Sequence, residues 1–297
     1  MTDIIEEGIK KPSAVALGFF DGLHLGHIEV IKRTLLIDGL SPVVFTFNDK
    51  TALPKFREKK GHSIITHEQK TEIFEKIGAE YIYAPDFNDV KDYSAREFVE
   101  LILRDKLSAA LVVCGYDFRF GKGGEGNPET LKTLCAEHGI KCEIVPAVTV
   151  DGETVSSTVI REKIRNGEIE TANRYLGYEL CYILPVIKGK QIGRTIGFPT
   201  INQKIPDYMV KPKNGVYKSW TIVDGKTYRS VTNIGVKPTV DYEGEALMET
   251  HIIGFNGDLY DKNIKVALRG YIRAEEKFSG LGELKERISA DKNSALL

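Results

Sequence analysis

Gly18-Phe19-Phe20-Asp21-Gly22-Leu23-His24-Leu25-Gly26-His27 is the stretch that decides the fold of the first part of the chain. Residues 14–20 form an apolar run typical of a buried strand, and residues 28–36 carry apolar side chains at helical spacing. The glycines allow a tight turn between them, so His27 is predicted to open a helix. A helix N-terminus favours an anion, and the two imidazoles add directed donors. The stretch predicts a nucleotide-phosphate site; a turn with a satisfied core histidine is the alternative.

Length and composition predict two domains and exclude several classes of protein. A chain of 297 residues with 42% hydrophobic content is long enough for two domains of roughly 150 residues, each with its own buried core. No apolar run approaches the roughly 18 residues of a membrane span, and no signal core is evident, so we expect a cytoplasmic protein without a membrane partner. The four cysteines form no Cys-x-x-Cys pair, which predicts reduced thiols. A net charge of −1 gives no basic footprint for nucleic acid.

Residues 1–180 are predicted to form a doubly wound α/β domain, a Rossmann-like sheet with helices on both faces. Further strand-like runs occupy 42–47, 79–84, 109–114 and 141–148. The signals for helix starts and ends between them are Thr66-x-x-Gln69, Ser94-x-x-Glu97, Asn127-Pro128, Gly78 and Gly139. In such sheets the ligand lies beyond the carboxyl ends of the strands, where His24 and His27 also fall.

Two more segments are expected at the same edge of this sheet. Gly115-Tyr116-Asp117-Phe118-Arg119-Phe120-Gly121 follows the strand that ends at residue 114. Its aspartate and arginine lie between aromatics and could hold a flat ring and a phosphate; a plain turn is the alternative. Ser156-Ser157-Thr158-Val159-Ile160-Arg161 places hydroxyls at the mouth of a helix that runs to Asn166. An N-cap alone accounts for one of these hydroxyls.

Residues 181–297 are predicted to form a different, all-β domain, a small closed barrel with a final helix near 281–289. Asp224-Gly225 between two strand-like runs, 215–223 and 226–234, is a two-residue hairpin signal.

Chemistry in this domain is indicated by two segments. In Gly193-Arg194-Thr195-Ile196-Gly197-Phe198-Pro199-Thr200-Ile201-Asn202 the glycines allow close approach to phosphates, and Thr200 and Asn202 offer oxygen ligands that suit Mg²⁺. An edge strand with turn hydroxyls is the alternative. In Leu247-Met248-Glu249-Thr250-His251, alternation places Glu249 on one face with apolar neighbours. Glu249 is either a base for an alcohol or a barrel-mouth residue paired with a basic side chain.

These segments together resemble the motifs of the prokaryotic bifunctional riboflavin kinase/FAD synthetase family. The stretch 18–27 resembles its nucleotidyltransferase signature, and residues 115–121 and 156–161 resemble its Gly-x-Asp-Phe-x-Phe-Gly and Ser-Ser-Thr-x-Ile-Arg motifs. Residues 199–202 and 249–251 resemble the Pro-Thr-x-Asn and Glu-Thr-His motifs of its kinase module. Asn233-Ile234-Gly235-x-x-Pro238-Thr239 and Arg273-x-Glu275-x-x-Phe278 fit its other landmarks.

The resemblance implies a role for each of these residues. Glu249 deprotonates the riboflavin 5′-hydroxyl, Thr200 and Asn202 hold Mg²⁺ with ATP, and His251 is structural. The implied ATP contacts are Gly18, Phe19, Asp21, His24, His27, Ser157, Thr158 and Arg161 in the first domain, and Gly193 and Gly197 in the barrel. The implied flavin contacts are Asp117, Phe118 and Arg119 in the first domain, and Arg273 and Glu275 in the barrel.

The implied function is the phosphorylation of riboflavin to FMN, with ATP going to ADP, followed by adenylyl transfer from ATP to FMN, which gives FAD and pyrophosphate. The sequence departs from the family at one point. After the second strand the family has a Pro-His-Pro element, where this chain reads Asn48-Asp49-Lys50. We therefore expect adenylyl transfer to be the weaker activity, and a kinase with an inactive first domain is the alternative. A flavin- or nucleotide-sensing regulator is a third reading.

Overall fold

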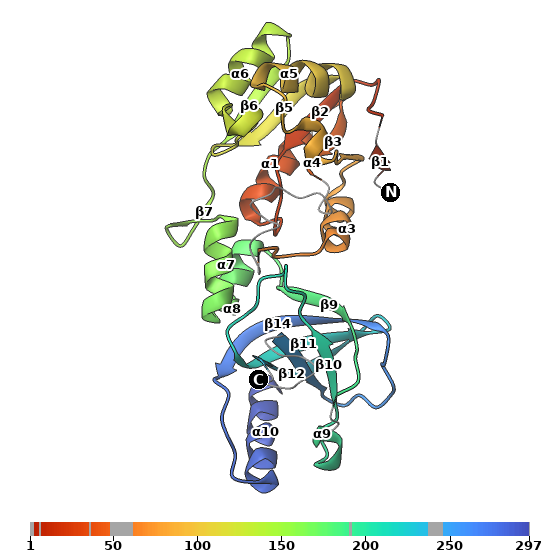
Figure 1. The fold of residues 1–297 in the computed structure, drawn as a ribbon, viewed down its shortest axis with the longest axis vertical. Helices are drawn as coiled ribbons and strands as arrows, with labels where there is room; N and C mark the ends of the chain where they lie inside the picture. The colour runs from red at the N-terminus through yellow and green to blue at the C-terminus, as the bar shows by residue number, and fades with distance from the viewer. Residues whose placement is uncertain are drawn as a thin grey trace. The chain divides into compact units, whose positions relative to one another are not determined.

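The computed structural model describes residues 3–5, 7–35, 37–47, 62–189, 192–236 and 246–296, with the backbone alone for 3–5, 192 and 194. The chain forms two compact units, drawn in Figure 1. The first ends at Ser157, and the second begins at Thr158 and also contains the described residues 62–64. Residues 158–180 are thus grouped with the barrel by their contacts, and the limits of the two catalytic domains at 180/181 stay a prediction.

The first unit is built on a six-stranded parallel sheet in the order β1-β4-β3-β2-β5-β6. Its strands are β1 (Asp3–Ile5), β2 (Ser13–Leu17), β3 (Ser41–Phe45), β4 (Tyr81–Tyr83), β5 (Ala109–Gly115) and β6 (Lys141–Val145). Val15 and Leu17 face a core that also contains side chains of η2 (Phe98–Lys106) and α6 (Pro128–Glu137). The small residues Ala14 and Ala16 face the opposite side, because side chains alternate along a strand. The doubly wound prediction is confirmed.

The helix signals of the first unit act as expected. Thr66 and Ser94 form complete capping boxes with Gln69 and Glu97, and they begin α3 (His67–Ile77) and α5 (Ala95–Glu97). Asn127 caps α6, and Gly78 ends α3 in the left-handed conformation. The remaining elements are α1 (Leu25–Leu35), α4 (Phe87–Val90), η3 (Lys122–Gly124), β7 (Thr149–Val150) and β8 (Glu153–Thr154).

Two predicted boundaries near the opening stretch were wrong. The first strand ends at Leu17 and not at residue 20, because Phe20 takes a positive φ of 56° that no strand residue adopts. The helix begins at Leu25, two residues before His27. The backbone N–H of Ile28 donates to the carbonyl of His24, which starts the helical hydrogen bonds earlier than the apolar period indicates.

The second unit contains a nearly closed antiparallel barrel in the strand order β10-β13-β12-β11-β14-β9. The strands are β9 (Cys181–Pro185), β10 (Thr200–Lys204), β11 (Gly215–Val223), β12 (Lys226–Val236), β13 (Ala246–Ile252) and β14 (Asn263–Arg273). The Ile187 N–H donates to the Asn202 carbonyl at 2.8 Å, which brings the two edges of the barrel together. The predicted hairpin at Asp224-Gly225 is confirmed, since both residues have positive φ angles between β11 and β12.

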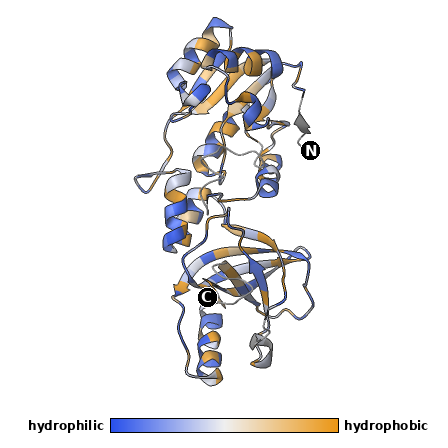
Figure 2. Ribbon diagram, viewed as in Figure 1, coloured by the Kyte–Doolittle hydropathy of each residue, from blue (hydrophilic) through white to orange (hydrophobic). Residues whose placement is uncertain are grey.

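Helices α7 (Ser157–Asn166), α8 (Ile169–Leu176), α9 (Ile192–Thr195) and α10 (Leu281–Leu296) complete the structure. The helix α9 falls in the region predicted to be all-β, because four residues are too few to show a helical period. The final helix runs past the predicted residue 289 to Leu296. In the first unit hydrophobic colour lies mainly on the strands of the sheet, whereas the helices carry hydrophilic and hydrophobic colour together (Figure 2). Among the described residues, no helix combines the length and the apolar character that a membrane span needs.

Candidate active sites

The first candidate site is the phosphate turn, residues 18–24, which follows β2. The turn is compact: a Cβ on Gly18 would lie 2.7 Å from the ring of Phe20, and Phe20 and Leu23 both have positive φ angles. Non-glycine residues in this conformation are uncommon and persist where the surroundings hold them in place. Asp21 is 5% exposed, and its carbonyl accepts a hydrogen bond from the Ser157 hydroxyl at 2.8 Å. The predicted residues Gly18, Phe19, Asp21 and Ser157 are therefore brought together.

His24 and His27 form a stacked pair at the start of α1. Their ring centroids lie 3.6 Å apart with an interplanar angle of 18°, and the backbone N–H of His27 donates to His24 Nδ1 at 3.3 Å. Gly26 leaves room for the pair, because a Cβ there would make a tight contact of 3.2 Å with the His24 ring. The rings of Phe20 and His27 also pack edge to face, with their centroids 5.3 Å apart. Two aligned imidazoles at a helix N-terminus suit an anionic oxygen.

Two buried residues that were not predicted from the sequence, Thr46 and Lys70, hold the phosphate turn in place. The Phe19 carbonyl accepts hydrogen bonds from Thr46 Oγ1 at 3.0 Å and from Lys70 Nζ at 3.1 Å. Thr46 is 2% exposed and Lys70 is 3% exposed. A signal for Lys70 existed, because it lies four residues before the buried Phe74, on the apolar face of α3. A lysine on the buried face of an amphipathic helix requires an explanation.

The predicted acceptor segment follows β5, the neighbour of β2 in the sheet. Leu17 pairs with Cys114, so the phosphate turn and residues 115–121 leave the same edge of the sheet. Phe118 is half-buried and stacks on Phe120 with centroids 5.7 Å apart, while Asp117 and Arg119 are exposed. The segment thus packs the rings of Phe118 and Phe120 against the core and presents the side chains of Asp117 and Arg119 to solvent.

The other two predicted ATP contacts of the Ser-Ser-Thr-x-Ile-Arg segment, Thr158 and Arg161, belong to the second unit. Thr158 follows Ser157 on α7, and Arg161 lies one turn later, 7% exposed. Arg161 Nε donates to the carbonyl of His62 at 2.6 Å. Residues 62 and 63 in turn pair with Tyr208 through backbone hydrogen bonds. The roles of Thr158 and Arg161 in ATP binding stay a prediction.

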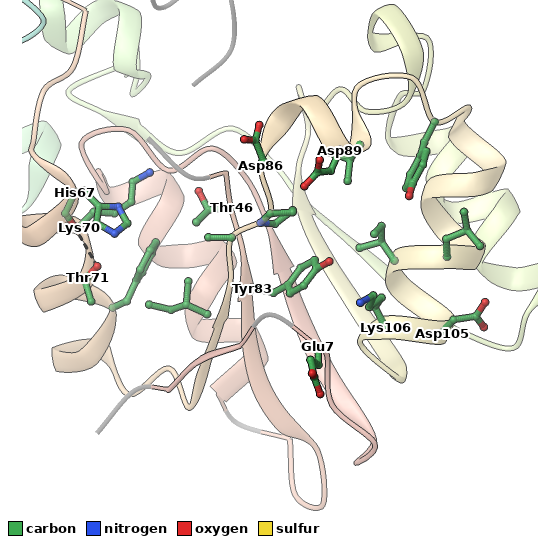
Figure 3. Close-up of a pocket in the computed structure, with 18 of the residues that line it drawn as sticks. Glu7, Thr46, His67, Lys70, Thr71, Tyr83, Asp86, Asp89, Asp105 and Lys106 are labelled. Carbon is green, nitrogen blue, oxygen red and sulfur yellow. Dashed lines mark hydrogen bonds between the residues drawn. The ribbon is translucent and has the colours of Figure 1, made fainter. Parts of the chain in front are cut away.

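A cavity of about 1080 Å³ opens beside β4 and reaches the carboxyl ends of β3 and β4. Thr46, His67, Lys70 and Thr71 line one part of it, and Tyr83 lies at its centre (Figure 3). Asp86 and Asp89 lie at another side. None of its described lining residues belongs to the predicted site. The cavity nevertheless borders the phosphate turn, because two of its lining residues, Lys70 and Thr46, donate hydrogen bonds to the Phe19 carbonyl.

The second candidate site is the barrel row, Asn202, Glu249 and Asn233, three residues placed side by side on adjacent strands. Glu249 of β13 pairs with Asn202 of β10 on one side and with Asn233 of β12 on the other. Glu249 alternates with the buried Met248 and Thr250, so it faces away from the barrel interior. Side chains directly opposite in such pairs have Cβ atoms roughly 4.5–5.5 Å apart. The register therefore brings one carboxylate between two amides. From the sequence, Asn233 was evident only as a landmark of the family resemblance.

Thr200 lies next to this row and is in register with His251. His251 is held in place, because its Nδ1 lies 2.9 Å from the carbonyl of Pro199 and its ring packs edge-on against Phe198. Burial lowers the pKa of His251, so the imidazole tends to be neutral. These contacts agree with a structural part for His251.

The glycine loop before β10 is shaped by close backbone approaches. A Cβ on Gly193 would overlap the carbonyl oxygen of Phe198. The backbone N–H of Phe198 in turn donates to the Gly193 carbonyl at 2.8 Å. Gly197 has a φ of 86°, which favours glycine. The two glycines are thus needed for the turn itself, and their part in ATP binding stays a prediction.

Arg273 and Glu275, the predicted flavin contacts of the barrel, already have protein partners. Arg273 forms a two-pronged ion pair with Asp291 of α10, with Nη2 to Oδ2 at 2.7 Å and Nε to Oδ1 at 3.0 Å. Glu275 Oε1 accepts from the Asn233 side chain at 3.2 Å, and a Cβ on Gly235 would overlap the same carboxylate. Glu275 therefore extends the barrel row, and Arg273 joins β14 to the final helix; their contacts with flavin stay a prediction.

Several residues on which the comparison with the family motifs depends, whether as matches or as the departure, lie outside the described residues. They are Asn48, Asp49 and Lys50, which replace the Pro-His-Pro element, and the landmark residues Pro238 and Thr239. The expectation that adenylyl transfer is the weaker activity therefore stays a prediction.

Comparison with known proteins identifies both halves of the chain. The family model described as FAD synthetase matches residues 6–159, and the one described as riboflavin kinase matches residues 176–296. A bifunctional riboflavin kinase/FMN adenylyltransferase from Bacillus subtilis is 37% identical over 294 residues, which cover 96% of this chain and 92% of the relative. The enzyme of the same name from Escherichia coli K12 is 31% identical and covers 98% of this chain and 94% of the relative.

A solved structure is similar over the same range. The crystal structure described as a macrolide-efflux protein from Streptococcus pneumoniae has a TM-score of 0.88 and 31% identity, and it covers 99% of this chain and 98% of that chain. Family models over both halves and relatives above 30% identity over nearly the whole length lead to one conclusion. The chain belongs to the family of bifunctional riboflavin kinase/FMN adenylyltransferases.

Proposed function

We propose that the barrel phosphorylates riboflavin at the row of Asn202, Glu249 and Asn233, and that the α/β unit adenylylates FMN at the phosphate turn. Both activities belong to the family, so the chain is a riboflavin kinase and an FMN adenylyltransferase that acts on riboflavin, FMN and ATP and forms FAD. The kinase alternative with an inactive first domain is not favoured, because the FAD synthetase model matches that domain. The two reactions use separate sets of residues.

In the kinase reaction Glu249 acts as the base. Its carboxylate takes the proton of the riboflavin 5′-hydroxyl as that oxygen attacks the γ-phosphorus of ATP, and ADP leaves. The observation that carries this assignment is the register that places Glu249 between Asn202 and Asn233 on the outer face of the strands. The side-chain amides of Asn202 and Asn233 orient the Glu249 carboxylate and the substrate. The amide of Asn233 is itself held by a hydrogen bond to Glu275.

The residues around Asn202 fit a magnesium ion. Asn202 is 8% exposed, and Gly189 has no side chain at the point where a Cβ would lie 2.5 Å from the Asn202 amide. Thr200 and Asn202 supply neutral oxygen atoms of the kind that Mg²⁺ accepts beside its water and nucleotide ligands. A bound Mg²⁺ would neutralise charge on the ATP phosphates. Thr200 and Asn202 would hold it, and Glu249 stays available for the proton.

In the adenylyl transfer the FMN phosphate attacks the α-phosphorus of ATP, and pyrophosphate leaves. His24 and His27 donate to the phosphate oxygens that gain charge, and the amides at the start of α1 favour the same oxygens. Ser157 fixes the turn through the Asp21 carbonyl. The part of Thr158 and Arg161 of α7 in ATP binding rests on the family resemblance alone. Asp117, Phe118 and Arg119 lie on the neighbouring strand end, where the acceptor FMN would bind.

Crossed variants test this division of work. Glu249→Gln should abolish FMN formation from riboflavin while FAD formation from supplied FMN persists, and His27→Ala should do the reverse. Asp258→Asn, at an exposed carboxylate of the barrel that caps Tyr260 N–H, is the matched control. Kinase turnover unchanged by Glu249→Gln, or FAD formation unchanged by His27→Ala, would refute the corresponding assignment.

We also propose that the enzyme works in the cytoplasm. All four cysteines are free thiols, which is typical of a reducing compartment. Cell fractionation followed by detection of the chain tests this location.

A further inference from the structure

Lys70 is a buried cation in the first unit to which the mechanism above gives no role. It lies in the first turn of α3, with 3% of its surface exposed, and it packs with Nζ 4.8 Å from the centre of the Phe19 ring. Burying an ammonium is costly, and a buried lysine is rare unless something holds its charge. Phe74, on the same helix face, is fully buried, so an apolar side chain at position 70 would extend the same packing at a lower cost. Packing alone does not explain a lysine here.

Lys70 contacts the part of the chain that shapes the phosphate turn. Its Nζ donates to the Phe19 carbonyl at 3.1 Å, and Thr46 Oγ1 donates to the same oxygen at 3.0 Å. Phe19 follows β2, and Thr46 follows β3, so both lie beyond the carboxyl ends of parallel strands, where ligands bind in such sheets. The carbonyl is thus held from two neighbouring elements, and the ammonium adds a positive charge at this edge of the sheet.

The turn beyond this carbonyl is under conformational constraint. Phe20 and Leu23 have positive φ angles of 56° and 38°, a region that non-glycine residues adopt only where their surroundings enforce it. The same turn ends in the His24–His27 pair. A change in the direction of the Phe19 peptide would rotate the residues after it and move both imidazoles relative to a bound phosphate.

We propose that Lys70 is a positioning residue for adenylyl transfer: by holding the Phe19 carbonyl it fixes the phosphate turn in the conformation that aligns ATP. The inference rests on the proposed role of the turn as the phosphate site. Lys70 acts through Phe19 and through its charge, and it leaves the contacts with the reacting atoms to His24 and His27. Since a displacement of about 1 Å in a reacting group can cost on the order of 10²-fold in rate, a modest shift of the turn is sufficient.

The test compares Lys70→Met with Lys70→Arg in the full-length protein. Lys70→Met keeps the length and the packing of the side chain but removes the donor and the charge. Lys70→Arg keeps both, and it has room because position 70 borders the cavity beside β4 (Figure 3). Lys76→Met on the same helix is the control, because Lys76 is exposed and forms a surface ion pair with Glu72 of its own helix. FAD and pyrophosphate formation from FMN and Mg·ATP are measured, with kcat and KM determined separately.

We expect Lys70→Met to lower kcat for FAD formation by about 10- to 10²-fold, with a smaller change in KM for ATP. Lys70→Arg should recover most of the rate, and Lys76→Met should match the wild type. Riboflavin phosphorylation in the barrel should stay unchanged in all three, which shows that the protein is folded and active. FAD formation by Lys70→Met within about threefold of the wild type would overturn the proposal, as would a loss that Lys70→Arg does not reduce.

Thr46→Val provides an independent test that does not depend on how Lys70→Met folds. It removes the second hydrogen bond to the same carbonyl with little change of shape, so kcat for FAD formation should fall in the same direction. An unchanged kcat in Thr46→Val would count against control of the turn through Phe19. His27→Ala separates the two claims. Loss of FAD formation in His27→Ala with none in Lys70→Met refutes the role of Lys70 alone, whereas FAD formation that survives His27→Ala refutes the proposed phosphate site and this inference with it.

Discussion

Removal of the Asp291 carboxylate should destabilise the barrel strongly. Asp291 of α10 is 4% exposed in its side chain, and its partner Arg273, at the end of β14, is 11% exposed. Three hydrogen bonds, of 2.7, 3.0 and 3.2 Å, join the pair. Asp291→Ala would leave the guanidinium buried without its main anionic partner. Breaking a buried ion pair by removing one partner costs about 3–5 kcal/mol, and we expect about 3 kcal/mol here because Arg273 also bonds the Ala274 carbonyl.

The single tryptophan of the chain makes the measurement specific to the second unit. Trp220 lies on β11, so its fluorescence during urea unfolding follows the barrel and not the α/β unit. With a urea dependence of about 1.5 kcal/mol per molar, a loss of about 3 kcal/mol lowers the midpoint by about 2 M. Asp207→Ala is the matched control. Its ion pair with Lys211, 2.7 Å long, is exposed at 53% on the aspartate side, and we expect a loss of about 0–1 kcal/mol.

The double variant Arg273→Met with Asp291→Leu distinguishes an ion-pair effect from a simple packing defect. Replacing both charged partners by apolar side chains of similar size is often neutral, so the midpoint should return toward that of the wild type. An Asp291→Ala midpoint no lower than that of Asp207→Ala would contradict this prediction. A double variant as unstable as Asp291→Ala would contradict it equally, because then the charge left behind is not the cause.

Three further predictions concern other parts of the chain. Asn202→Ala should raise the Mg²⁺ concentration needed for FMN formation, since it deletes an oxygen ligand; an unchanged Mg²⁺ titration would contradict the assignment. A fragment that begins at Thr158 should unfold at a higher urea concentration than one that begins at Tyr178, because Asn173 bridges the Leu268 carbonyl and the Leu180 N–H. Equal midpoints would show that α8 is dispensable. Hydrogen bonds from neighbouring thiols lower the pKa of Cys142, so its thiolate persists as the pH falls; iodoacetamide should label it before the other cysteines, and still do so between about pH 8 and pH 6.

The sequence predicted the fold well where local chemistry decides the structure. The capping boxes at Thr66 and Ser94 and the Asp224-Gly225 turn are satisfied within three or four residues, so their geometry does not depend on distant partners. Boundaries failed where a tertiary contact overrides the local pattern. Phe20 continues an apolar run but leaves the sheet with a positive φ angle, because the phosphate turn is fixed by contacts from β3 and α3.

The candidate sites could be predicted only in part, because strand register and side-chain partners are long-range properties. Glu249 and Asn202 were identified one by one, but their place beside Asn233 depends on two strand pairings that no local pattern specifies. Arg273 was expected to contact flavin, and the structure shows that it also pairs with Asp291, 18 positions later, a partner that no local pattern indicates. The assignment of Arg273 to flavin stays a prediction. A flavin contact that displaced Asp291 from the guanidinium would cost the energy of that buried ion pair.

The two units place their functional groups by different means, and this affects how each responds to substitution. In the barrel, Glu249 stands on a strand with paired neighbours on both sides, so its position is determined by the hydrogen bonds of three strands. In the α/β unit the imidazoles stand after an irregular turn, whose direction depends on two side chains, Thr46 and Lys70, bound to one carbonyl. Local openings start where backbone pairing is sparse. Substitutions remote from the reacting atoms should therefore affect FAD formation more readily than FMN formation, and Lys70 is the position where the difference should be largest.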